Sequence, residues 1–96
     1  MKEAQKMQAK MAKVQEDLRT RTVEAQSGGG MVHVVCNGQQ EILRITIEPE
    51  LLKEDDVEMV QDLILAAVNE ALQRSKTLAQ EELAKITGGL DISGFF

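Results

Sequence analysis

The sequence has no tryptophan and no tyrosine, and its only aromatic residues are Phe95 and Phe96. Proteins that bind nucleic acid by stacking its bases need aromatic platforms, so the composition argues against that mode of binding. The chain has one cysteine, Cys36, and one histidine, His33. A single cysteine excludes a disulfide within the chain and a zinc site made of clustered cysteines.

Long apolar runs are also missing. The longest extends from Leu63 to Val68, which is far shorter than the roughly 20 residues that cross a bilayer as a helix. Lysines interrupt the N-terminal segment every three or four residues, so we expect no signal peptide. These absences predict a soluble, intracellular protein with no membrane partner.

The residue types that form catalytic and ligand-binding sites are present, but they lack the neighbours and spacing that such sites need. His33 lies between two valines and is predicted on the solvent face of a strand, while Cys36, in phase with those valines, is predicted as a small buried residue. The glycines at 28–30 lack the Lys-Ser/Thr ending of a phosphate loop. The acidic run 54–56 lacks the alternating oxygen ligands of a calcium loop. We therefore expect no enzyme activity, cofactor, metal site or small-molecule substrate.

Charge is distributed unevenly along the 96 residues, whose formal net charge is −5. Residues 1–21 hold six basic and three acidic side chains, whereas residues 22–96 hold five basic and thirteen acidic ones. Four lysines of the first segment fall within one arc of about 80° on a helix: Lys2, Lys6, Lys10 and Lys13. This asymmetry favours a surface that meets a polyanion. The alternative is that the lysines solvate the outer face of a packed helix.

The first segment, from about residue 2 to 21, is rich in good helix formers. Its apolar residues recur at steps of three and four: Ala4, Met7, Met11, Val14 and Leu18. This spacing predicts a helix whose apolar seam packs against another helix.

The middle of the chain reads as a sheet. Strands are predicted at about 22–26, 31–36 and 41–47, with a flexible glycine turn at 27–30 and a type I′ turn at Asn37-Gly38. Simple alternation places Leu43, Ile45 and Ile47 on one face of the last strand. A bulge or a longer loop near Gln39 and Gln40 would instead turn Ile42 inward, so the register stays open.

A long second helix follows Pro49, which cannot donate to a sheet ladder. Asp55 or Asp56 supplies its N-cap, and Gly88-Gly89 supplies its stop after Ile86. Its apolar stripe is broad in the first half and narrow in the second: Val57, Val60, Leu63, Ile64, Ala67, Val68, Ala71, Leu72, then Ser75, Leu78, Ala79, Leu83, Ile86.

The broad half of this stripe suits a sheet and a partner helix, and the narrow half suits the first helix. A helix of about 45–50 Å is longer than a compact body of this size, whose diameter is roughly 33 Å. The excess apolar surface predicts a homodimer. A monomer with a projecting helical end is the alternative.

Several segments together resemble the YbaB/EbfC family of nucleoid-associated proteins. They are AQKMQAKMAKVQEDL, GGGMVHVVCNG, ITIEPELLKEDDVEMVQDLILAAVNEAL and a final GGL. The resemblance covers nearly the whole chain, in order and in spacing. It implies one α+β domain over 1–96, with a helix at about 2–21, a three-stranded antiparallel sheet at about 22–48, a long helix at about 55–86 and a tail at 87–96. It also implies a homodimer with projecting helical arms, double-stranded DNA as a partner, and a location in the bacterial cytoplasm on the nucleoid.

The expected function is architectural binding of duplex DNA through phosphates, with weak sequence preference. The predicted contact residues are the four lysines of the first helix, and with less support five further residues: Arg19, Arg21, Arg74, Lys76 and Lys85. Family members commonly carry lysines in and after the hairpin, where this chain has only Arg44, so the first helix is the main candidate surface. The alternative function is a prefoldin-like chaperone or protein scaffold that grips partners with its helical arms.

Overall fold

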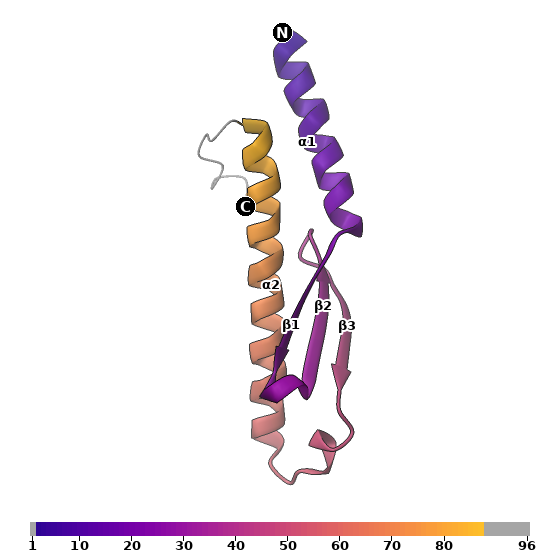
Figure 1. Cartoon of the computed structure of the whole chain (residues 1–96), viewed down its shortest axis with the longest axis vertical. Helices are drawn as coiled ribbons and strands as arrows, with labels where there is room; N and C mark the ends of the chain where they lie inside the picture. The colour runs from indigo at the N-terminus through magenta and orange to yellow at the C-terminus, as the bar shows by residue number, and fades with distance from the viewer. Residues whose placement is uncertain (1, 88–96) are drawn as a thin grey trace.

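The computed structural model describes residues 2–87 and shows two helices flanking a small sheet (Figure 1). The elements in chain order are α1 (Lys2–Thr20), β1 (Thr22–Ser27), η1 (Gly28–Gly30), β2 (Val32–Asn37), β3 (Ile42–Ile47), η2 (Leu51–Lys53) and α2 (Val57–Thr87). The predicted α+β fold is confirmed. The predicted helix stop at Gly88-Gly89 and the tail lie outside the described residues.

The molecule is elongated. The sheet lies along the first half of α2, whereas α1 runs beside the second half of α2 and extends past its end (Figure 1). The principal extents are 62 × 22 × 16 Å and the Cα radius of gyration is 17.2 Å. A compact chain of this length would have a radius of gyration of about 12–13 Å, so α1 is a projecting arm.

Small residues bring α2 close to the sheet. Ala67 and Ala71 are fully buried against β1 and β2, where they join a core formed with the inward residues of these strands and of η2: Ala25, Val32, Val34, Cys36 and Leu51. A second buried group, formed by Leu18, Ala79 and Leu83, joins the base of α1 to α2. The predicted division of α2 between sheet and first helix is therefore confirmed.

Val57 is an exception to the predicted stripe, because its side chain is 64% exposed. The sheet ends near Leu63, whose carbonyl accepts a hydrogen bond of 2.6 Å from Ser27 Oγ at the end of β1. Val57 lies six residues before that point, about 9 Å along the helix axis, and so has no strand beneath it. The predicted N-cap is confirmed at Asp56, whose Oδ1 accepts a 3.0 Å hydrogen bond from the Met59 amide.

The sheet is antiparallel with strand order β1-β2-β3. Val34 pairs with Ala25 on one side and Ile45 on the other, and the register between β2 and β3 shifts after Val35. Because Val35 pairs with Arg44 and Cys36 pairs with Ile42, one residue of β3 is extra at this point. This bulge lies at Leu43 rather than near Gln39 and Gln40, and it turns Ile42 to the face of Cys36. The alternative in which Ile42 turns inward, which the sequence left open, is therefore confirmed.

The turn between β2 and β3 also differs from the prediction. A type I′ turn needs a positive φ at both central residues, but Gly38 has none, and the positive φ of this loop, 64°, occurs at Gln40. The Gln40 amide donates to the Asn37 carbonyl at 3.2 Å, and the Asn37 amide donates to the Glu41 carbonyl at 2.9 Å. The loop is thus a three-residue hairpin turn that ends in a left-handed residue. Gly38 serves a different purpose, which is a close contact with α1.

Candidate nucleic-acid interface

The arm α1 is almost entirely exposed. Of its residues only Leu18 is buried, whereas Met11 and Val14 are half-buried and Met7 is 37% exposed. The apolar seam predicted from the spacing is therefore buried at the base of the arm and becomes exposed toward the N-terminus. There Met7 and Ile86 line one shallow depression between α1 and the end of α2.

The four lysines of α1 form the clearest charged feature of the arm. We call Lys2, Lys6, Lys10 and Lys13 the lysine stripe; all four are exposed, and none forms an ion pair with a described residue. On a helical wheel the stripe is centred about 120° from the apolar seam. Its positive charge is therefore available to a ligand that approaches from the side of the arm.

Most of the other predicted contact residues already have partners. Arg19 pairs with Glu16 on α1. Arg21 Nη1 lies 2.8 Å from Glu82 Oε1, and Lys85 Nζ lies 3.1 Å from the same atom. These two cations hold the pKa of Glu82 below its ordinary value, Arg21 having the larger effect.

Arg74 is bound to the body of the protein. Its Nε lies 3.1 Å from Glu70 Oε1, and its Nη1 donates to the Glu24 carbonyl at 2.6 Å. Lys76 is exposed and has no ion pair with a described residue. Of the five secondary candidates, Lys76 alone thus presents a charge unneutralised by the rest of the described chain.

His33 and Cys36 occupy the positions that the sequence predicted. His33 faces away from α2, with Nε2 3.5 Å from Glu24 Oε2. Cys36 is fully buried in the core, and this burial raises the pKa of its thiol. A protonated, inaccessible thiol is a poor nucleophile and a poor metal ligand. Within residues 2–87 we find no group of three His, Cys, Asp or Glu residues placed to hold a metal ion.

Sequence reasoning did not locate an exposed apolar surface that lies on β3. Ile42 and Ile45 are on the side of the sheet that faces α2, but α2 packs against β1 and β2 and leaves β3 uncovered. These two side chains are 36% and 45% exposed, and Leu43 on the bulge is 55% exposed. The alternating pattern indicated an inward face but could not show that the helix is too narrow to cover it.

The neighbouring flank of α2 continues this surface. Leu63 and Arg74 contact the β1 side of the sheet, through Gly28 and the Glu24 carbonyl respectively. Leu72 lies about 180° from Leu63 on the helical wheel, and Leu65 about 160° from it, so both lie on the β3 flank. Leu65 is 59% exposed. We call Ile42, Leu43, Ile45, Leu65 and Leu72 the β3 surface.

These features define a small α+β protein that carries a basic helical arm on an acidic body. The model of the YbaB/EbfC DNA-binding family matches residues 1–90. The chain belongs to this family of DNA-binding proteins, and its similar relatives are named nucleoid-associated proteins, not enzymes. Neither of its described helices combines the length and apolarity needed to cross a bilayer.

Similar proteins cover the whole described chain. A "Nucleoid-associated protein" of Ruminiclostridium cellulolyticum is 57% identical over 90 residues, which cover 94% of this chain and 78% of that protein. A protein of the same name from Acetivibrio thermocellus is 57% identical over 97 residues, covering 100% of this chain and 86% of the relative. The crystal structure of the uncharacterized protein HP0035 from Helicobacter pylori has the same fold, with a TM-score of 0.78, 24% identity and 88% coverage of both chains.

Proposed function

We propose that this protein binds double-stranded DNA as a homodimer, with the lysine stripe of α1 contacting phosphates. The observation that carries the proposal is the set of four exposed lysines on one flank of a projecting helix, none of them paired with a described residue. The family membership supplies DNA as the partner. We propose the same location that the family implies, the nucleoid within the cytoplasm.

The chemistry of the stripe favours phosphates over bases. A lysine ammonium is a flexible point charge, whereas bidentate readout of guanine in the major groove is typical of arginine. The three arginines among the predicted contact residues, Arg19, Arg21 and Arg74, have acidic partners within the protein. We therefore expect weak sequence preference, with any preference arising from DNA shape. The net charge of −5 per chain opposes binding and makes it modest and salt-sensitive.

The β3 surface supports the dimer. On this surface, α2 leaves the apolar side chains of β3 exposed, and an apolar flank of α2 lies beside them. A second copy of the chain offers the same surface, so a two-fold contact would cover both. Such a dimer carries two arms and doubles the number of lysines that meet one duplex.

A pair of charge-matched variants tests the stripe. Lys6→Gln/Lys10→Gln removes two positive charges from the stripe. Gln5→Glu/Gln8→Glu changes the net charge by the same amount on the opposite flank of α1, where both glutamines are exposed. DNA affinity is measured by fluorescence anisotropy at several salt concentrations, after circular dichroism has shown that each variant is helical.

We expect the lysine variant to bind about tenfold or more weakly than wild type, since each lost phosphate contact removes counterion release. If two or three lysines of each arm meet phosphates, the wild-type slope of log affinity against log salt is roughly −4 to −5. The slope should flatten in the lysine variant and stay near the wild-type value in the glutamate variant. Equal affinities for the two variants would contradict the stripe as the binding surface. A chaperone that grips clients through the apolar seam would keep its client protection in both.

A further inference from the structure

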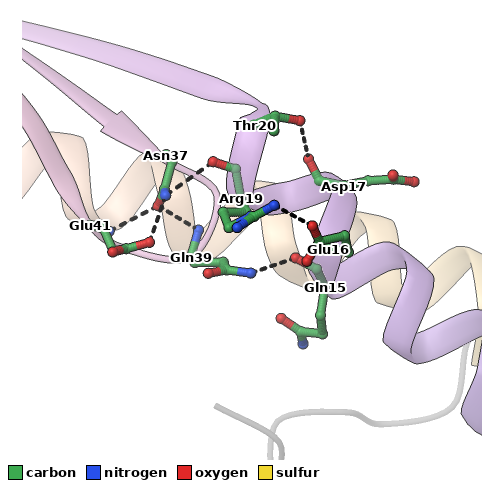
Figure 2. A network of polar contacts seen from close by, with 8 residues as sticks. All are labelled: Gln15, Glu16, Asp17, Arg19, Thr20, Asn37, Gln39 and Glu41. Atoms are coloured by element: carbon green, nitrogen blue, oxygen red, sulfur yellow. Dashed lines mark hydrogen bonds and ion pairs between the residues drawn. The ribbon is translucent and has the colours of Figure 1, made fainter.

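The end of α1 is capped by a distant turn rather than by its own sequence. The last four carbonyls of a helix have no partner within the helix. Here the turn between β2 and β3 supplies donors to two of them, those of Leu18 and Arg19, and to the neighbouring carbonyls of Gln15 and Arg21. The Gly38 amide donates to the carbonyls of Leu18 and Arg21 at 2.8 and 2.9 Å. Asn37 Nδ2 donates to the Arg19 carbonyl at 3.1 Å, and Gln39 Nε2 donates to the Gln15 carbonyl at 2.6 Å. Figure 2 shows the two side-chain donors of the turn pointing into the last turns of α1.

Asn37 is the centre of this arrangement. Its side chain is buried, and all of its hydrogen-bonding capacity is used: Nδ2 also donates to Glu41 Oε1 at 2.8 Å, while Oδ1 accepts from the amides of Gln39 and Glu41 at 2.9 and 3.0 Å (Figure 2). A buried polar side chain with every partner in place has one favourable orientation. The amide that caps Arg19 is thereby held rigidly by the turn.

Ser75 joins the same turn to the middle of α2. Its hydroxyl is completely buried, donates to the Asn37 carbonyl at 2.7 Å and accepts from the Gln40 amide at 3.0 Å. We call Asn37, Gly38, Gln39 and Ser75 the turn junction. Through it, the last turns of α1 and the midpoint of α2 are fixed to a single hairpin loop.

Gly38 makes this contact sterically possible. A Cβ at this position would lie 2.8 Å from the Leu18 carbonyl oxygen and 2.7 Å from Leu18 Cδ2. Both distances are shorter than a real Cβ contact allows, so any side chain at Gly38 would push the turn away from α1. The glycine is thus required by the approach to the arm and not by its own φ.

From this geometry we propose that Ser75 and Asn37 are positioning residues for DNA binding, because they set the angle at which α1 projects. This inference rests on the proposed function of the lysine stripe. Lys6 lies twelve residues from Leu18, about 18 Å along the helix. A change of 10° in the direction of α1 would therefore move Lys6 by about 3 Å, which is enough to break a phosphate contact. No member of the junction itself touches DNA.

The test uses two serines whose hydroxyls each form a hydrogen bond between α2 and another element. Ser75→Ala removes the bond between the turn and α2. Ser27→Ala is the matched control, because Ser27 Oγ donates to the Leu63 carbonyl at 2.6 Å at the opposite end of the sheet, far from the arm. Urea unfolding establishes that both variants are folded. Gln39→Ala is a second variant, in which the one exposed member of the junction loses its bond to α1 and the buried members, Asn37, Gly38 and Ser75, are unchanged.

Arm direction is measured directly by electron paramagnetic resonance between nitroxides at Gln8→Cys and Gln73→Cys, two exposed positions on α1 and α2. Cys36 is buried and stays unlabelled. Labelled chains are diluted with unlabelled ones so that only distances within a chain are seen. We expect a narrow distance distribution in wild type and Ser27→Ala, and a broad one in Ser75→Ala and, to a smaller degree, in Gln39→Ala.

DNA affinity at several salt concentrations is the second readout. We expect Ser75→Ala to bind roughly three- to tenfold more weakly than Ser27→Ala, because binding must then order an arm that the junction no longer holds. The salt slope should be unchanged, since the same lysines neutralise the same phosphates. This separates the inference from the proposed function, whose failure would appear as unchanged binding by Lys6→Gln/Lys10→Gln.

Two results would overturn the inference. One is an unchanged distance distribution in both Ser75→Ala and Gln39→Ala, which would show that other contacts, such as the packing of Leu18 and the Arg21–Glu82 pair, orient the arm without these bonds. The other is a broad distribution with DNA affinity equal to that of Ser27→Ala, which would show that arm direction does not matter for binding.

Discussion

Arg21 and Glu82 join the base of the arm to α2 through a contact of 2.8 Å between Nη1 and Oε1. They are 61 positions apart in the sequence. Glu82 also accepts a hydrogen bond from Lys85 at 3.1 Å on its own helix, so two cations share one carboxylate. Two residues predicted to contact DNA, Arg21 and Lys85, are thereby paired within the protein, and the Arg21 contact holds the base of the arm against α2.

This carboxylate makes the stability of the protein depend on pH. Arg21 first, and Lys85 second, hold the pKa of Glu82 below its ordinary value, which is about 4.3 for a free glutamate. A group whose pKa is lowered by folding stabilises the native state above its unfolded pKa, and this contribution is lost as the pH falls through the folded value. Glu82→Gln should therefore lower the urea midpoint at pH 7, and this effect should become smaller as the pH is lowered toward 3.

The matched control is Glu81→Gln, which removes an exposed carboxylate that forms no ion pair with a described residue. Its midpoint should lie near the wild-type value at both pH values. Equal midpoints for the two variants at pH 7 would show that the Arg21–Glu82 pair contributes nothing measurable, as many exposed pairs do.

The β3 surface predicts the effect of placing a charge on the sheet. Ile45→Glu should give a folded monomer, because an unpaired carboxylate is costly to bury between two copies. Thr46→Glu is the control, since Thr46 lies on the opposite face of the same strand and is exposed. Analytical ultracentrifugation should show a dimer for wild type and Thr46→Glu. A folded wild-type species of 10.6 kDa at micromolar concentration would contradict the proposed dimer.

Cys36 is predicted to be chemically inert in the folded protein. Its side chain is completely buried, and desolvation raises the pKa of the thiol. Ellman's reagent should therefore react with it only at the rate of unfolding. Cys36→Ala should cost about 1–2 kcal/mol of stability from lost packing and leave DNA affinity unchanged. Rapid reaction in the native protein would show that the core around β2 opens locally.

The N-cap of α2 is predicted to be a separate source of stability. Asp56→Ala removes the acceptor of the Met59 amide and should cost about 1 kcal/mol in urea unfolding, as lost caps commonly do. Asp55→Ala, at an exposed neighbour without a cap bond, should cost much less. DNA binding should be retained in both variants, because the cap lies at the end of the molecule opposite the arm (Figure 1).

Much of the fold could be predicted from local patterns. The spacing from Met7 to Leu18 predicted α1 and its packing face, and alternation around Val34 predicted that Cys36 is buried and His33 is not. These predictions succeeded because helix and strand periodicities depend only on neighbouring residues. The lysine stripe was visible for the same reason, since its four members are on one helix.

Contacts between distant segments decided the remainder. The spacing of apolar residues could not show that Glu82 would form an ion pair with Arg21, that Leu43 would form the bulge, or that α2 would leave Ile45 uncovered. The dipeptide Asn37-Gly38 was read as a type I′ turn from local preference, but its glycine is needed for a contact with Leu18, twenty positions earlier. Local residue patterns were enough to define the elements and the flank of α1 that carries positive charge. Which charges stay free and how the arm is held became visible only in the folded chain, because both depend on the partners that folding brings together.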